Sequence, residues 1–197
     1  SNVQNIKSLQ LKSVFNLTNS NTPFDKGFYL RPTIDASKTF TALHNYTFGA
    51  TYALEQNQIS NKLTDTITPL SFAFENITAY VRSDVAKPNH WSFNYFIRKD
   101  KLPFGKSLLQ SDRSHNYNFQ AELLKNQKHQ LRLNVTYRQL FITNTALTTQ
   151  TPDNSILGRA EYLVNEWNGF LKGNVLYELG AGKEPKRNFT YIEVPAG

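Results

Sequence analysis

The chain of 197 residues carries 22 Lys and Arg against 15 Asp and Glu, a net charge of +7, and 13% of its residues are aromatic. It has no cysteine, which excludes disulfides, thiol catalysis and cysteine-ligated metals. It has no methionine either, and together with the Ser-Asn start this predicts a mature or excised piece of a longer protein. The length fits a single domain, residues 1–197, and no apolar run approaches the roughly 18 residues of a membrane helix.

The positive charge is spread along the chain, and the first interpretation is an ordinary solvated basic surface. Such a surface also suits an anionic lipid, an acidic polysaccharide or nucleic acid as a partner. Nucleic acid is the least favoured of the three, because no RNA-binding or zinc-finger motif accompanies the charge. The tight group of cations is IRKDK at residues 97–101. It stands between two apolar stretches, a placement typical of a hairpin tip.

Apolar and polar residues alternate with period two through much of the chain, which predicts β-strands. The pattern is clearest in YTFGATYAL (46–54) and HWSFNYFI (90–97). In LSFAFENITAYV (70–81) the apolar residues change from even to odd positions, and we predict a β-bulge near Glu75 and Asn76. Less regular strands are expected at roughly 6–18, 27–38 and 187–194, and loops at 19–27, 100–106 and 148–155.

The parity of the apolar positions defines a first hairpin. Apolar residues from Tyr117 to Leu123 and from Leu131 to Tyr137 all have odd numbers. Because residues paired across a ladder point to the same face, the loop between them must hold an odd number of residues. We predict a three-residue loop centred on Gln127, with Leu123 opposite Leu131 and Tyr117 opposite Tyr137. The reverse face is then polar and in contact with water.

A second hairpin is predicted around Asn168-Gly169, because both residues tolerate the positive φ of a type I′ turn. Centring the turn there places Trp167 opposite Phe170, Tyr162 opposite Val175, and Ala160 opposite Tyr177. The same register places Arg159 opposite Glu178 on the reverse face. An opposite-charge pair that follows from a register chosen on other grounds supports that register.

These elements together predict an all-β fold. We expect an antiparallel up-and-down meander of about ten strands, each about 8–13 residues long, that forms an open curled sheet, a half-barrel or a sandwich. A complete membrane barrel is less favoured, because the apolar faces run for only four or five residues before polar ones intrude and the chain ends in Pro-Ala-Gly.

The sequence offers little catalytic chemistry. The four histidines stand before or at the start of expected strands, in no metal-ligand spacing, and no cofactor or metal is expected. The stretch GAGKE at 180–184 lacks the spacing of a phosphate-binding loop and is interpreted as a turn. Glu178 is better explained by its ion pair with Arg159 than by a catalytic role. We therefore expect no enzymatic activity.

The aromatic stripes are the informative feature. They fit an ordinary core, an apolar-ligand surface on a concave face, or lipid-facing strands, and periodicity alone does not separate these three. For ligand binding the candidate residues are Phe48, Tyr52, Trp91, Phe93 and Tyr95.

The leading hypothesis is a non-enzymatic cell-envelope module that acts as an assembly scaffold or binds a lipid or other apolar ligand, with envelope proteins as further partners. One alternative is a segment of an integral outer-membrane β-barrel that acts as a channel or translocation component. The other is a polysaccharide-active or polysaccharide-binding domain, because aromatic side chains also stack on sugars.

The last 25 residues, GNVLYELGAGKEPKRNFTYIEVPAG from Gly173 to Gly197, resemble a segment of very large, uncharacterised cell-envelope proteins of Bacteroidota. The resemblance implies a fragment of a long β-rich protein located in a Gram-negative envelope, in the periplasm or at the outer membrane. In that family the segment continues into an acidic stretch resembling a calcium loop, which this sequence does not contain. Asp65-Thr66-Ile67 is similar to the O-glycosylation motif of those bacteria, with Thr66 as the acceptor.

Overall fold

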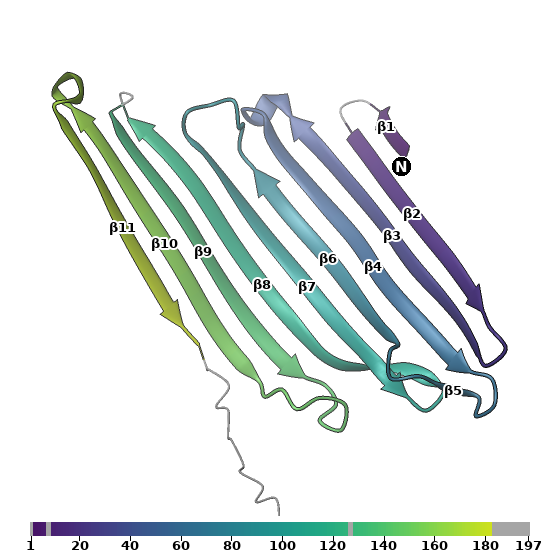
Figure 1. Ribbon diagram of the computed structural model, residues 1–197. Helices are drawn as coiled ribbons and strands as arrows, with labels where there is room; N and C mark the ends of the chain where they lie inside the picture. Colours follow the sequence, from purple (N-terminus) through teal and green to yellow (C-terminus); the bar gives the residue numbers. More distant parts are fainter. Residues whose placement is uncertain (1, 7–8, 126–127, 183–197) are drawn as a thin grey trace, which may run out of the picture.

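The computed structural model describes residues 2–6, 9–125 and 128–182, which form a single antiparallel sheet (Figure 1). The strands of the described chain are β1 (Asn2–Ile6), β2 (Leu9–Asn21), β3 (Asp25–Phe40), β4 (Tyr46–Asn61), β5 (Thr66–Ile67), β6 (Phe72–Arg82), β7 (His90–Phe104), β8 (Ser107–Lys125), β9 (His129–Ile142), β10 (Asp153–Glu166) and β11 (Leu171–Ala181). Two short 3-10 turns, η1 (Thr41–Leu43) and η2 (Trp167–Gly169), occur at strand connections, and the described residues contain no α-helix.

The strands follow one another across the sheet in chain order, except that the short β5 pairs with β4 beside the main path. Within the described chain, β1 and β11 form the two edges and do not pair with each other. The predicted open antiparallel meander is therefore confirmed. The strands are longer than predicted, because β3 and β4 each hold 16 residues and β8 holds 19.

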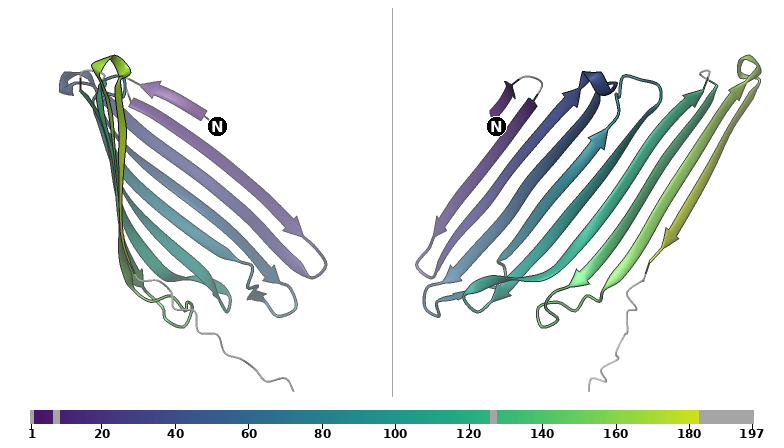
Figure 2. Two further views of the ribbon diagram at one scale, coloured as in Figure 1. Left: turned by 60° about the vertical axis from the view of Figure 1, so that its left-hand side comes forward. Right: turned by 180° about the vertical axis from the view of Figure 1, so that it is seen from behind.

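The sheet is one layer thick, twisted and curled rather than flat (Figure 2). Its strands run obliquely between two lines of turns, one at each end of the sheet (Figure 1). We call the end that carries η1 and η2 the upper end and the end that carries β5 the lower end. No second layer of described chain covers either face, so the fold lacks the packed interior of a sandwich.

The β8–β9 hairpin has the register that parity predicts. Tyr117 pairs with Tyr137, Leu123 with Leu131, and the ladder closes at Lys125 and His129. This leaves three residues for the loop, as predicted, although Gln127 at its centre lies outside the described residues. On the reverse face the predicted polar pairs, from Asn118 and Thr136 to Glu122 and Arg132, are present.

The β10–β11 hairpin also has the predicted register, with Arg159 opposite Glu178 and their charged atoms 3.5 Å apart. The Phe170 N–H donates to the Trp167 carbonyl oxygen at 3.1 Å, so Asn168 and Gly169 occupy the two central turn positions. Their φ angles of 56° and 91° are those of a type I′ turn. The ladder itself ends at Glu166 and Leu171, so Trp167 and Phe170 both belong to the turn.

The bulge predicted in β6 is wrong. Residues from Phe72 to Arg82 pair with β4 in an unbroken register, so the change of phase in the sequence is a real change of face. Phe72 and Phe74 lie on the face opposite to Ile77 and stack on each other with ring centroids 4.8 Å apart. The guanidinium of Arg98 covers the Phe74 ring at 4.3 Å. Aromatic stacking and a cation–π contact thus hold these two rings on the polar side.

A bulge occurs elsewhere, between β7 and β8, where the register shifts at Asp100 and Lys101. The IRKDK cluster (97–101) lies inside β7 and not at a hairpin tip, so that prediction is also wrong. The tip is at Gly105 and Lys106, and Gly105 has the positive φ of 61° that a tight turn requires.

The remaining segment predictions are partly correct. The expected strand at 6–18 is divided between β1 and β2, and the expected loop at 19–27 shrinks to residues 22–24 because both flanking strands extend into it. The expected loop at 148–155 gives way to β10 at Asp153. The expected strand at 187–194 lies outside the described residues.

A close side-chain fit joins β4 to β6. The ring of Tyr80 lies over Gly49, where a Cβ would overlap the ring, and the Tyr80 hydroxyl donates to Asp35 on β3 at 3.2 Å. The absence of a side chain at Gly49 therefore lets one aromatic ring bridge three strands. This is the packing by which an aromatic residue compensates for glycine in a sheet.

We expect Gly49→Ala to destabilise the sheet by about 1–3 kcal/mol, because the new methyl group displaces the Tyr80 ring. Gly158→Ala is the matched control, since a Cβ at Gly158 meets its nearest atom at 3.9 Å. Urea unfolding followed by far-UV circular dichroism measures both. In a Tyr80→Ala background, Gly49→Ala should lower the free energy of unfolding much less, because the ring that the methyl group displaces is absent. Equal destabilisation by Gly49→Ala and Gly158→Ala in the wild-type background would contradict this packing.

Candidate functional site

The pairing registers divide the side chains into an apolar face and a polar face. Most of the apolar face is one continuous surface on neighbouring strands, which we call the apolar band. It consists of Tyr46, Phe48, Ala50, Tyr52 and Leu54 on β4; Ile77, Ala79 and Val81 on β6; Trp91, Phe93, Tyr95 and Ile97 on β7; Tyr117, Phe119, Ala121 and Leu123 on β8; Leu131, Leu133, Val135 and Tyr137 on β9; and Ile156, Gly158, Ala160, Tyr162 and Val164 on β10. No Lys, Arg, Asp or Glu stands within the band.

Aromatic rings gather along both ends of the band. Toward the lower end, Tyr95, Tyr117 and Tyr137 form a row with ring centroids 4.9 and 6.0 Å apart, and the Tyr95 hydroxyl lies 2.6 Å from His115 Nδ1. Toward the upper end, Tyr46 contacts Trp91 with ring centroids 5.7 Å apart. Apolar side chains thus occupy the middle of the band, and rings with polar tips lie at its borders.

From β4 to β7 the burial of the two faces is the reverse of that in a water-soluble sheet, whereas on β9 the polar residues Arg132, Asn134 and Arg138 are the more exposed ones. At the centre of the band Phe93 and Phe119 are each 37% exposed and Ile77 is 41% exposed. On the polar face directly behind them, Thr78, Asn94 and Asn118 are half-buried, and further along β8 Asn116 is only 6% exposed. The curl of the sheet accounts for this, because side chains converge on a concave face and diverge on a convex one.

The apolar residues do not follow the hydrogen-bonded rows straight across the sheet. On β2 the apolar stretch runs from Leu9 to Leu17 with Ser13 at its centre, and on β10 the centre of the band is Ala160. The row of partners that begins at Ser13 continues through Ile34, Tyr52, Ile77, Ile97, His115, Gln139 and Asn154.

Asn154 lies six residues before Ala160 on the same strand, so the apolar surface shifts by six residues over seven strand-to-strand steps. Six residues correspond to about 20 Å along a strand, and seven steps to about 34 Å across the sheet. Within the plane of the sheet, the apolar surface therefore does not run at a right angle to the strands but deviates from it by about 30°. This deviation is close to the strand tilt of closed barrels.

The five residues predicted to bind an apolar ligand all lie on the apolar face. Phe48 and Tyr52 are on β4, and Trp91, Phe93 and Tyr95 are on β7, but β6 separates the two groups. Phe48 is 45% exposed and Tyr52 is 36% exposed. The five rings form part of a broad open surface rather than a compact cluster.

The polar face carries a network of side-chain hydrogen bonds. Asn118 Nδ2 donates to Asn134 Oδ1 at 3.0 Å and to Thr136 Oγ1 at 2.9 Å, which links β8 to β9. On the same face, between β3 and β4, Thr51 Oγ1 donates to Asp35 Oδ2 at 2.5 Å. These bonds cross strand boundaries and fix the side chains of a polar, half-buried surface.

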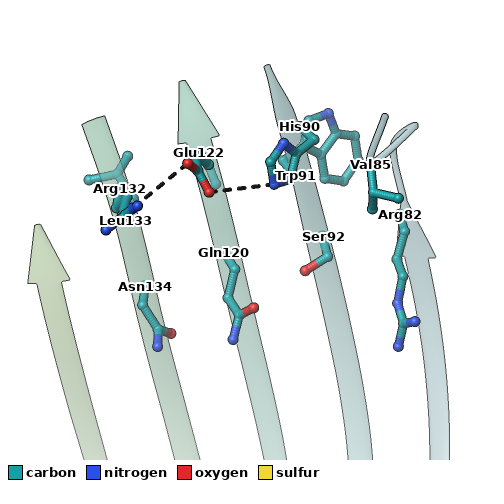
Figure 3. Close-up of a pocket in the computed structure, with 11 residues that line it drawn as sticks. Arg82, Val85, His90, Trp91, Ser92, Gln120, Glu122, Arg132, Leu133 and Asn134 are labelled. Carbon is teal, nitrogen blue, oxygen red and sulfur yellow. Dashed lines mark ion pairs between the residues drawn. The ribbon is translucent and has the colours of Figure 1, made fainter. Parts of the chain in front are cut away.

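A hollow of about 420 Å³ opens at the upper end of β6 to β9 (Figure 3). Glu122 lies at its centre, with one carboxylate oxygen 3.7 Å from His90 Nε2 and the other 3.7 Å from Arg132 Nε. Arg132 also lies 3.7 Å from Glu161 on β10. The hollow is lined by polar and charged side chains together with the apolar Val85, Trp91 and Leu133, and two arginines, Arg82 and Arg132, accompany the single carboxylate.

The connection between β6 and β7 borders this hollow and is tied to the turn before β4. Asn45 Nδ2 donates to Asp84 Oδ2 at 3.0 Å, and the Ala86 N–H donates to Asp84 Oδ1 at 3.0 Å. These two bonds hold the pKa of the Asp84 carboxyl below its ordinary value, because both favour the ionised form. The bond from Asn45 has the larger effect and the bond from Ala86 the smaller one.

The other candidate groups are dispersed. His115 lies in the middle of β8 and not at the start of a strand as predicted, and no three His, Asp or Glu side chains of the described residues come close enough to hold a metal ion. Thr66 is exposed at the start of β5, where its hydroxyl lies 2.7 Å from that of Thr64, and its glycosylation stays a prediction. In residues 2–6, 9–125 and 128–182 there is no helix long and apolar enough to cross a membrane.

Comparison of the chain with protein-family models, with curated proteins and with solved structures gave no match.

The low pKa of Asp84 gives a pH prediction. A carboxyl whose pKa is depressed by folding stabilises the fold above its unfolded pKa of about 3.8, and this contribution is lost as the pH falls through the lower folded value. We expect the difference in unfolding midpoint between the wild type and Asp84→Ala to shrink as the pH is lowered from 6 to about 2.5. A difference that is the same at every pH would contradict the role of the ionised carboxylate.

Proposed function

We propose that this sheet is part of the wall of a β-barrel that spans a lipid bilayer, with the apolar band against the acyl chains and the polar face toward an aqueous interior. The barrel acts as a channel or translocation component in the outer membrane of a Gram-negative envelope. The observation that carries the proposal is that, on β4, β6 and at the centre of β7, the apolar face of a single-layer sheet is the more exposed one. In water such a surface is unfavourable, whereas in lipid it is the required one.

The arrangement along the band supports the same conclusion. Transmembrane barrels carry an outward apolar belt flanked by aromatic girdles, with strands tilted by about 35–45°. The Tyr95, Tyr117 and Tyr137 row and the Tyr46 and Trp91 contact correspond to such borders. The inclination of about 30° between strands and band comes close to the tilt.

The shortness of the apolar faces is compatible with this function. Each band strand contributes three to five alternate residues, which extend about 13 Å along β6 and about 27 Å along β4 and β10. The strands themselves continue beyond the band, to 16 residues in β4 and 19 in β8. These lengths exceed the roughly 9–11 residues that a tilted strand needs to cross a bilayer.

A soluble ligand-binding module is less well supported. A ligand pocket encloses most of its ligand, whereas Phe48, Tyr52 and Phe93 stand on a surface without walls. A lipid bilayer, unlike a single ligand, covers the whole of such a surface. A barrel in lipid leaves no sheet edge open, so under this proposal further strands pair with the edges on the β1–β2 and β11 sides.

The two tryptophans provide a direct test. Trp91 lies in the band, and Trp167 lies in the upper turn, 68% exposed. In phosphatidylcholine vesicles with brominated acyl chains, we expect strong fluorescence quenching of the Trp167→Phe variant, which keeps Trp91. The Trp91→Phe variant, which keeps Trp167, should be quenched much less. If Trp91 is not quenched although circular dichroism shows the folded sheet, the band does not face lipid.

Adjacent residues on β7 allow a matched charge test. Phe93 is at the centre of the band and Asn94 points to the polar face. We expect Phe93→Lys to cost about 2–4 kcal/mol of folding free energy in vesicles, the penalty for a lysine at the bilayer midplane. Asn94→Lys should cost far less, as measured by urea titration of the vesicle-bound chain. A larger cost for Asn94→Lys would assign the faces the other way round.

A further inference from the structure

The apolar face changes to charged residues just beyond the lower aromatic row. Glu75 on β6 pairs in register with Lys99 on β7, and Lys99 pairs with Arg113 on β8. Glu75 Oε2 lies 3.6 Å from Lys99 Nζ and 3.7 Å from Lys101 Nζ. Three cations and one carboxylate thus lie together on the face that carries the apolar band.

The charges of this group do not balance. Glu75 is shared by Lys99 and Lys101 and is itself mostly shielded, with 18% of its side chain exposed. Arg113 has no carboxylate within ion-pair distance among the described residues, and its guanidinium lies 5.6 Å from the centre of the Phe141 ring. Lys99 and Arg113 are direct cross-strand partners of like charge, an arrangement that is destabilising unless an anion lies between or above them.

The position of the group indicates which anion this is. Its direct neighbours on the side of the band are Ile97 and His115, and the Tyr95 and Tyr117 rings that mark the lower border lie one alternate position further along the same face. If the band faces lipid, the next residues along β7 and β8 lie at the depth of the headgroups. From this we infer that Lys99, Lys101 and Arg113 bind the phosphate of an anionic lipid headgroup, an inference that rests on the function proposed above.

The chemistry of the three side chains suits a phosphate. A guanidinium offers parallel N–H donors that match two phosphate oxygens, and the lysine ammonium groups add two mobile point charges. The upper end of the sheet differs, because there Lys128 Nζ lies 2.9 Å from Glu166 and is neutralised. Lys38, the cation beside the upper border on the apolar face, stands over the Phe40 ring at 5.1 Å.

The experiment uses the full chain in detergent micelles, mixed with equal amounts of phosphatidylglycerol and phosphatidylcholine, and native mass spectrometry counts the retained lipids. The wild type should retain phosphatidylglycerol preferentially. Each lost cation should lower that preference about five-fold, so Lys99→Gln with Arg113→Gln should nearly abolish it. Lys38→Gln is the matched control on the same face and should leave the preference unchanged.

Two results would overturn the site. One is an unchanged preference in the double variant while Trp91 is still quenched by brominated lipid, which would leave the proposed barrel wall intact. The other is a loss of preference in the Lys38→Gln control as large as that in the double variant, which would indicate a general charge effect. Absence of Trp91 quenching would contradict both the barrel wall and this site.

Competition with inorganic phosphate tests whether the bound phosphate must belong to a lipid. If millimolar inorganic phosphate displaces the lipid, the three cations recognise phosphate alone and the lipid inference is wrong.

Discussion

The constraint on which this structure depends is that a single-layer sheet has no interior. Its backbone groups are satisfied by the ladders between neighbouring strands, but the side chains of each face must find their environment outside the described chain. The apolar side chains buried within the described chain are few: Ile67, Ala73, Ala121 and Leu140. What surrounds each face therefore determines both the stability of the sheet and its function.

Local rules were enough to predict the hairpins from the sequence. The odd positions of Leu123 and Leu131 and the Asn168-Gly169 pair each act over a few residues, and both registers are as predicted. The prediction of a bulge in β6 is wrong because it assigns two aromatic residues, Phe72 and Phe74, to the apolar face by residue type alone. Their stacking and the Arg98 contact depend on a neighbouring strand, and the sequence of β6 does not contain that information.

The same limit applies to the candidate site. Period two separates an apolar from a polar face and correctly groups Phe48 with Tyr52 and Phe93 with Tyr95. It does not tell which face is concave, because curvature is a property of the whole sheet. The ordinary expectation places the apolar residues on the shielded side, and here Phe93 is more exposed than Asn94 behind it. The oblique course of the apolar surface likewise appears only once all the registers are known.

The two faces divide the physical tasks between them. Directional interactions lie on the polar face: the Tyr80 hydroxyl donates to Asp35 and joins β6 to β3, and the Asn118 amide donates to Thr136 and joins β8 to β9. The apolar band has no such bonds at its centre, and under the proposed function it needs none, because contact with acyl chains would be non-directional. Polar rings and unbalanced cations appear on the convex face only where the band ends. This distribution is the one expected if the apolar face spans a bilayer, as proposed above.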